Sequence, residues 1–445
     1  MNPLAAVRPR SPSPAALRAT TEHRSPSAAA ARSEASIRRR LGWVWGLLFV
    51  NILAYTVKSP VLHLPVTMGK VITQGALVAA VVLALSINRR VLVRPNLFLF
   101  LLTVLCITSV MMSVRGYFGL GSALRAGRLV LLIATLWLIT PWWGRRDLLL
   151  FQYHRRALYV ILAVVLIGIP FSPHEAFAQA GGGRLGGTIW PIPPTQVADY
   201  AAILGGTTII LWFTGLIKPR VALGVTLGST VVLLLTHTRT ALVALLVAVL
   251  VAALSLVISR KRVRTVLVVV VVAGGLIALS AAPFLTAWFT RGESAHELAS
   301  FTGRTTVWAQ LAAQPRSELH ALFGYGMSND SFHGLSIDSS WYSAYLDQGL
   351  FGDVIDAATL LLLGVLAVLS PRGPRRALAL FLVVYCLLAS ITETGLGQAS
   401  SYLLDLAIAM SLLMTPLGEP SGRHPVATSG PPHQGRAALP PSRTT

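Results

Sequence analysis

Long apolar runs, separated by short polar connections, repeat along almost the whole chain. A helix needs about 20 apolar residues to cross the hydrocarbon core of a bilayer, and twelve runs approach this length. They are 41–57, 68–87, 96–114, 124–143, 157–171, 196–215, 220–236, 240–258, 265–283, 352–370, 376–392 and 400–416. Charged residues are only 12% of the chain, about half their share in soluble domains. The sequence therefore predicts an all-α, polytopic membrane helix bundle of about twelve transmembrane helices.

Basic residues mark alternate connections between these runs. With the N-terminus placed in the cytoplasm, 27 of the 37 Lys and Arg residues fall in inside segments and tails. Most acidic residues, among them Glu175, Asp338 and Glu393, fall outside. Cytoplasmic loops of membrane proteins collect Lys and Arg. The alternation therefore predicts that both termini are cytoplasmic, and it explains the net charge of +21 without a nucleic-acid partner.

The two ends of the chain differ in composition from its middle. Residues 1–40 are rich in Ser, Pro, Ala and Arg, and residues 417–445 are rich in Pro and Gly. We expect both to be disordered cytoplasmic tails, because they hold too few apolar residues to form a core. Residues 41–416 then form the membrane domain, in which 284–351 is the one large extracytoplasmic loop.

Three of the expected outside segments carry an arginine that suits an anion. Arg184 lies among glycines, which let backbone N–H groups approach a ligand closely. Arg239 lies in a tight turn between the seventh and eighth runs, where low dielectric strengthens its pairing with phosphate. Arg304 opens an amphipathic segment of the large loop. The alternative for Arg184 is an incidental loop residue, and for Arg239 an anchor at a helix end.

The large loop also contains candidate proton acceptors. Asp338 precedes a hydrophobic stretch that re-enters a helix, Asp347 lies nine residues later, and His333 lies just before them. We expect Asp338 and His333 to be catalytic, and Asp347 to bind substrate together with the three arginines. The alternatives are solvated loop residues or a helix N-cap for the acids, and a surface residue for the histidine. No Asp-x-Asp or His-rich cluster occurs outside, so we expect no metal and no cofactor.

These segments, in this order, give the chain a resemblance to a known family. Arg184-Leu-Gly-Gly-Thr precedes a span, and Thr238-Arg239-Thr240 forms a turn; the loop then carries Arg304, a Gly-Tyr-Gly turn and the stretch 338–352. Over roughly residues 40–416 this resembles the O-antigen ligase and polysaccharide polymerase family of bacterial membrane proteins. Ligases of that family carry a histidine eleven residues before the first glycine of a Gly-x-x-Gly. This chain has Asp338 there, which favours the polymerases.

The resemblance implies an enzyme of the bacterial cytoplasmic membrane that joins saccharides held on a polyprenyl pyrophosphate carrier. Arg184, Arg239 and Arg304 would stabilise the departing diphosphate, and Asp338 or His333 would accept the proton of the attacking hydroxyl. The lipid bilayer, and a chain-length regulator or a flippase, are the expected partners. The alternatives are a ligase that transfers finished glycan to a lipid or protein acceptor, and a polysaccharide or lipid transporter.

Overall fold

The computed structural model describes most of the chain between its two tails. The described residues are 28–53, 55, 59–115, 118–178, 183–257, 263–266, 269 and 304–415. The predicted tail 417–445, nearly all of the ninth apolar run and the first part of the large loop lie outside them. Residues 28–40, which composition assigned to a disordered tail, instead begin a helix. Glu34 pairs there with Arg38 at 3.0 Å, one turn later.

Helices make up nearly all of the described chain. The first group comprises α2 (Ala28–Ile52), α3 (Val66–Ile87), α4 (Leu97–Val114), α5 (Gly119–Ile139), the 3-10 turn η1 (Thr140–Trp142), α6 (Leu149–Phe171), α7 (Pro173–Ala178), α8 (Pro194–Phe213), α9 (Pro219–Leu235) and α10 (Arg239–Val257). The second group comprises α14 (Arg304–Ala313), α15 (Glu318–Phe323), strands β1 (Ser331–Phe332) and β2 (Leu335–Ser336), α16 (Ser340–Leu369), α17 (Pro374–Ala389) and α18 (Ser401–Leu413). The two strands pair antiparallel as a short hairpin.

The described helices make this a polytopic membrane protein. Seven of them, α3, α4, α5, α6, α8, α10 and α16, are long and apolar enough to cross a membrane, and α9 and α18 are shorter apolar helices. Every predicted run except the ninth overlaps a described helix. The count of twelve spans and the placement of both termini stay predictions.

Helix α6 is longer than hydropathy predicts, because its first turns carry polar residues that find partners inside the protein. It begins at Leu149, whereas the apolar run begins at 157. The hydroxyl of Tyr153 donates to the carbonyl of Arg38 at 2.6 Å, and Arg155 donates to the hydroxyl of Thr208 at 3.1 Å. Polar side chains are stable at this depth only when they are satisfied internally.

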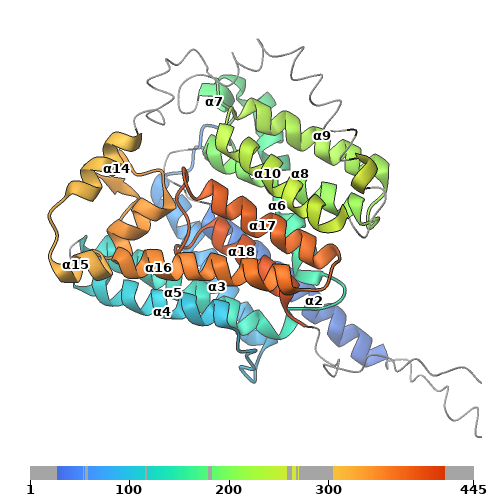
Figure 1. The fold of residues 1–445 in the computed structure, drawn as a ribbon, viewed down its shortest axis with the longest axis horizontal. Helices are drawn as coiled ribbons and strands as arrows, with labels where there is room; N and C mark the ends of the chain where they lie inside the picture. Colours follow the sequence, from blue (N-terminus) through green and yellow to red (C-terminus); the bar gives the residue numbers. More distant parts are fainter. Residues whose placement is uncertain are drawn as a thin grey trace, which may run out of the picture.

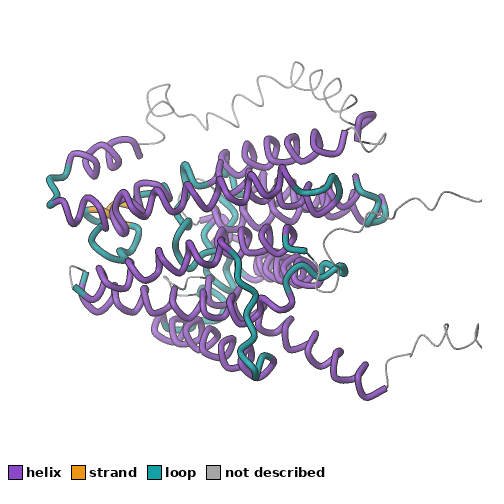
Figure 2. Tube along the Cα trace, turned by 60° about the horizontal axis from the view of Figure 1, so that its bottom comes forward, coloured by secondary structure: helices purple, strands orange, loops and turns teal. Residues whose placement is uncertain are grey.

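The helices lie side by side along the long axis of the molecule (Figures 1 and 2). Helix α16 packs between α4 and α17, and α17 packs against α10 and α18. The short helices α14 and α15 lie at one end of the bundle, and the start of α2 lies at the other (Figure 1). Helix α8 is the most buried of the candidate spans.

Buried polar contacts join the central helices. Asp199 on α8 accepts hydrogen bonds from the hydroxyl groups of Tyr385 on α17, at 2.6 Å, and Tyr402 on α18, at 2.8 Å. His154 on α6 lies 3.0 Å from Asp405 on α18. All five side chains are buried. The two contacts fix the positions of α17 and α18, and so they also fix the loop 390–400 that joins these helices.

A kink in α16 brings the large loop onto the bundle. Gly349 has φ of 65° and ψ of −166°, which interrupts the helix. At the kink, the carbonyl groups of Leu346 and Asp347 accept hydrogen bonds from Tyr325 and Gly326, both at 2.9 Å. The Gly-Tyr-Gly turn is therefore hydrogen-bonded to backbone carbonyls at the kink. Glycine is required at position 349, because the backbone of Leu322 approaches it closely.

Replacing Gly349 by alanine should destabilise the protein. A Cβ there would lie 2.5 Å from the carbonyl carbon of Leu322, and the left-handed conformation alone costs roughly 1–2 kcal/mol for a residue with a side chain. The midpoint temperature of unfolding of the detergent-solubilised protein measures this effect. The matched control is Gly364→Ala on the same helix, where no atom lies within 4 Å of the added Cβ. Equal midpoints for the two variants would contradict the close approach.

Candidate active site

A cavity of about 570 Å³ opens where the starts of α8 and α10, the end of α17 and the large loop meet. Arg184, Arg239, Arg304 and Asp338 all line this cavity, although they lie on three segments far apart in sequence. The other lining residues are Thr195, Thr238, Thr240, Val243, Ala244, Leu388, Ile391, Thr392 and Glu393. The structure thus brings four of the six site residues predicted from sequence around one space.

Arg184 is held in place by the turn that follows α9. Its Nε donates to the carbonyl oxygen of Thr236 at 3.0 Å, and its Nη2 donates to the hydroxyl of Thr238 at 3.2 Å. The backbone N–H of Leu185 donates to the carbonyl of Leu235 at 2.9 Å. The glycine-rich segment is therefore bound to the end of α9 at this point, and the Arg184 guanidinium has a fixed position beside Arg239.

Arg239 is the first residue of α10, and only a tight turn separates α10 from the end of α9. His237 has φ of 51°, a left-handed conformation that few non-glycine residues adopt. Thr238, Arg239 and Thr240 all line the cavity. The N-terminus of α10 therefore opens toward it, and the partial positive charge of a helix N-terminus adds to that of the guanidinium.

Arg304 and Asp338 form an ion pair at the edge of the cavity. Nε of Arg304 lies 3.1 Å from Oδ2 of Asp338, and the hydroxyl of Ser336 donates to the other carboxylate oxygen. The indole N–H of Trp308, one turn after Arg304, donates to the carbonyl of Ile337 at 2.7 Å. Helix α14 is thereby fixed against the segment that carries Asp338. Both partners of the ion pair are partly exposed, so the pair contributes little to stability.

Glu393 is a cavity residue that sequence reasoning did not select as a site residue, although it placed this acid outside. It lies in the loop after α17, where its carbonyl accepts a hydrogen bond from the Ser340 hydroxyl at 2.8 Å. Burial raises the pKa of its side chain to about 8; the charge of Asp199 also raises it, and Arg304 and Arg184 oppose this shift. The side chain of Glu393 is therefore largely protonated at neutral pH.

A local pattern in the sequence would have pointed to Glu393. It follows an apolar run directly and has a threonine on each side, as Arg239 does. The two patterns meet in the structure, where the Thr392 hydroxyl donates to the Thr240 hydroxyl at 2.7 Å. This bond joins the start of α10 to the end of α17 beside the cavity.

His333 and Asp347 do not line the cavity. His333 lies in the exposed turn between β1 and β2, with its ring edge-on to Phe332 at 4.3 Å between centroids. Asp347 is completely buried in α16, where its carboxylate accepts a hydrogen bond from the backbone N–H of Ser328 at 2.9 Å. In this structure Asp347 holds the loop against the helix.

The cavity favours an anion. Its lining holds three guanidinium groups and two carboxyl groups, and protonation of Glu393 at neutral pH leaves the guanidinium charges in excess. Burial lowers the pKa of Arg184 below its usual value, but an arginine keeps its charge at physiological pH. Among the described residues, no group of three or more His, Cys, Asp or Glu side chains is arranged to hold a metal ion.

Comparison with known proteins gives a family match for one segment of the chain. No curated protein matches the chain. Residues 223–352 match the family model described as O-antigen ligase, over α9, α10 and the part of the large loop that ends at the Gly-x-x-Gly of α16. The matched segment contains Arg239, Arg304 and Asp338. The predicted resemblance to the O-antigen ligase and polysaccharide polymerase family is therefore confirmed for this segment of a multi-pass membrane protein.

Proposed function

We propose that this protein is a membrane polymerase that joins saccharide units carried on polyprenyl pyrophosphate at the outer face of the bacterial cytoplasmic membrane. The observation that carries this proposal is the cavity lined by Arg184, Arg239 and Arg304 together with two carboxyl groups. A diphosphate is the anionic part of such a carrier. Planar guanidinium groups bind phosphate oxygens through two parallel hydrogen bonds, more strongly where water is excluded.

The proposed reaction transfers one glycosyl group. The oxygen of an acceptor hydroxyl attacks C1 of the donor sugar, and the bond from C1 to the diphosphate oxygen breaks. The electron pair of that bond leaves with the polyprenyl diphosphate, whose negative charge grows in the transition state. Arg239 and Arg184, with the N-terminus of α10, stabilise that charge. Loss of one such contact typically costs about 3–4 kcal/mol of barrier.

The acceptor hydroxyl must lose a proton, and two carboxyl groups of the cavity are candidates to take it. Asp338, the candidate chosen from sequence, has one carboxylate oxygen bound to Arg304 and the other to Ser336. Glu393, with a pKa of about 8, is the more basic carboxylate, and a pKa near the working pH suits general base catalysis. We therefore assign the role of general base, which accepts this proton, to Glu393, with Asp338 as the alternative. His333 would reach the cavity only if its hairpin moved.

The rival functions differ in what they would leave in a cell that lacks the protein. Loss of a polymerase leaves short carrier-linked units, whereas loss of a ligase leaves long chains that are not attached to an acceptor. A transporter would use ionisable groups near the membrane midplane. The candidates for such a role are Asp405, Asp353 and Asp356. Asp405 instead pairs with His154 and joins α6 to α18, whereas Asp353 and Asp356 lie on α16.

Inorganic diphosphate should stabilise the purified protein against heat. A ligand that binds only the folded state adds about 1.4 kcal/mol at ten times its dissociation constant. The Arg239→Ala variant should lose most of the resulting rise in unfolding midpoint. Arg220→Ala is the control, because this exposed arginine lies at the start of α9 and does not line the cavity. An unchanged shift in Arg239→Ala would show that the anion binds elsewhere.

Arg239→Ala and Asp338→Ala should each stop glycan lengthening in cells. Removal of Arg239 takes away a group that stabilises transition-state charge, which lowers a rate about 10²–10³-fold. Removal of Asp338 leaves Arg304 without its ion-pair partner at the edge of the cavity. The length distribution of the surface glycan measures this effect, and short carrier-linked units should still reach the outer face. Full-length polymer in both variants would exclude the proposed site, and loss of translocation with normal chain length would favour a transporter.

The rate of glycosyl transfer should rise with pH, with a midpoint near 8. Glu393 accepts a proton only when it is ionised, so activity is lost as the pH falls below its raised pKa. Glu393→Gln should be slower by about 10²–10⁴-fold and should lack this limb of the pH profile, whereas Glu393→Asp should keep it. The measurement is the initial rate against pH with a purified lipid-linked donor. The same limb in Glu393→Gln would show that Glu393 is not the base.

A further inference from the structure

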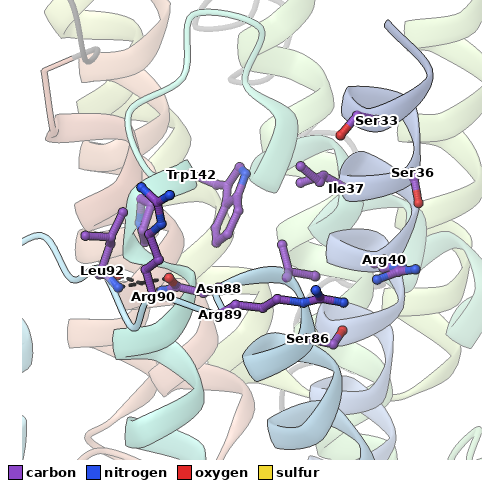
Figure 3. A pocket seen from close by; sticks show the side chains of 12 residues that line it. Ser33, Ser36, Ile37, Arg40, Ser86, Asn88, Arg89, Arg90, Leu92 and Trp142 are labelled. Carbon is purple, nitrogen blue, oxygen red and sulfur yellow. Dashed lines mark hydrogen bonds between the residues drawn. The ribbon is translucent and has the colours of Figure 1, made fainter. Parts of the chain in front are cut away.

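A second hollow, of about 530 Å³, lies at the other end of the helix bundle. Helix α17 runs from this end of the bundle to the candidate active site. Arg375, near the start of α17, donates to the carbonyl of Gly144 at 3.0 Å, and Leu388, near its end, lines the candidate active site. The residues around this basic hollow are Ser33, Ser36, Ile37, Arg40, Ser86, Ile87, Asn88, Arg89, Arg90, Leu92, Pro141 and Trp142 (Figure 3).

Three arginines give the basic hollow its charge. Arg40 comes from α2, and Arg89 and Arg90 come from the turn after α3; no acidic residue lines the hollow. Figure 3 shows Arg89 extending from its turn toward α2, and Arg90 beside Trp142. Within the described part of the chain, none of the three guanidinium groups has a hydrogen bond or an ion pair. The hollow thus has a positive charge that no described residue neutralises.

Neighbouring arginines at the same end of the bundle are neutralised within the protein. Arg38 lies 3.0 Å from both Glu34 and Asp147. Arg145 lies 2.9 Å from Glu34 and 3.2 Å from Asp147. These acids are within reach of the paired arginines but do not line the basic hollow. The hollow therefore differs from the sites of Arg38 and Arg145, where acids lie beside the guanidinium groups.

The turn that carries Arg89 and Arg90 is rigid and strained. The side chain of Asn88 is buried and donates to the carbonyl oxygens of Leu92, at 2.6 Å, and Leu138, at 2.8 Å. It also accepts a hydrogen bond from the backbone N–H of Leu92 at 2.9 Å. Val91 has φ of 48°, which is an outlier for a β-branched residue. Such strain persists where the surroundings hold it, and it is found often at ligand sites.

The walls of the basic hollow suit the membrane–water boundary. Ile87 is the last residue of α3, and Trp142 ends the 3-10 turn after α5, so the hollow lies where apolar helices end. Helix α3 is the least buried of the candidate spans. Its exposed side therefore faces lipid, and a lipid headgroup can enter the hollow while its acyl chains remain in the bilayer.

We propose that the basic hollow binds the phosphate of an anionic phospholipid headgroup from the leaflet at this end of the bundle. Arg40, Arg89 and Arg90 supply the charge-assisted hydrogen bonds, and the hydroxyl groups of Ser33 and Ser36 complete them. Basic pockets between transmembrane helices bind anionic headgroups in this way. A soluble phosphate has the same chemistry, but the position at the bilayer surface and the lipid-facing wall favour the lipid. The proposal does not depend on the proposed enzymatic function.

Native mass spectrometry of the purified full-length protein tests this proposal, with phosphatidylglycerol and phosphatidylcholine as probes. The wild type should retain one tightly bound phosphatidylglycerol and no phosphatidylcholine. Arg89→Ala/Arg90→Ala should weaken that binding by about thirtyfold. Lys218→Ala/Arg220→Ala is the matched control, because it removes two positive charges at the start of α9, outside the hollow, and should bind like the wild type.

Four results would overturn the proposal. They are unchanged phosphatidylglycerol binding in Arg89→Ala/Arg90→Ala, equal loss in the control variant, equal binding of phosphatidylcholine, or displacement of the lipid by inorganic phosphate, which would indicate a soluble anion. Both double variants must elute as a single species with the unfolding midpoint of the wild type. If Arg89→Ala/Arg90→Ala fails to fold, Arg40→Ala takes its place, because Arg40 lies on α2 and leaves the strained turn intact.

Discussion

A bilayer offers no hydrogen-bond partner to a polar group in its core, and this constraint arranges the whole molecule. Inside the bundle, Asp199 pairs with Tyr385 and Tyr402, and His154 pairs with Asp405. The remaining charge is displaced toward the ends of the helices. Basic cavities lie at both ends, and the two described above combine guanidinium groups with the apolar walls of helix ends.

The candidate active site depends on buried contacts that it does not itself contain. Asp199 fixes α17 and α18, which carry the two ends of the loop that presents Thr392 and Glu393. The kink at Gly349 fixes the large loop in a similar way, because backbone carbonyls at the kink accept hydrogen bonds from that loop. Both devices place polar side chains beside the start of α10 without exposing unpaired backbone. A site assembled in this way keeps its arginines close together in spite of their mutual repulsion.

Most of the membrane architecture was readable from hydropathy, and the exceptions have physical causes. Helix α6 begins before its apolar run because Tyr153 and Arg155 find partners inside the protein. Helix α2 extends back to Ala28, where an Ala-rich stretch and the Glu34–Arg38 pair support a helix. The three arginine segments were also readable, since each sets an arginine in an unusual local context. Glu393 was not selected, although a threonine on each side of it repeats the pattern around Arg239; the structure shows that the two patterns meet beside one cavity.

The sequence by itself determined that the chain is a polytopic membrane protein and which segments carry candidate anion-binding residues. Both properties follow from local composition. The cost of placing charge in hydrocarbon applies to each span separately, and each arginine segment is recognised by its own neighbouring residues. Only the tertiary structure decided which of those residues share a cavity. It brought Arg184, Arg239, Arg304 and Asp338 together with Glu393, left His333 in an exposed turn and buried Asp347. These positions depend on helix packing and on contacts between residues far apart in the chain, which no local pattern records.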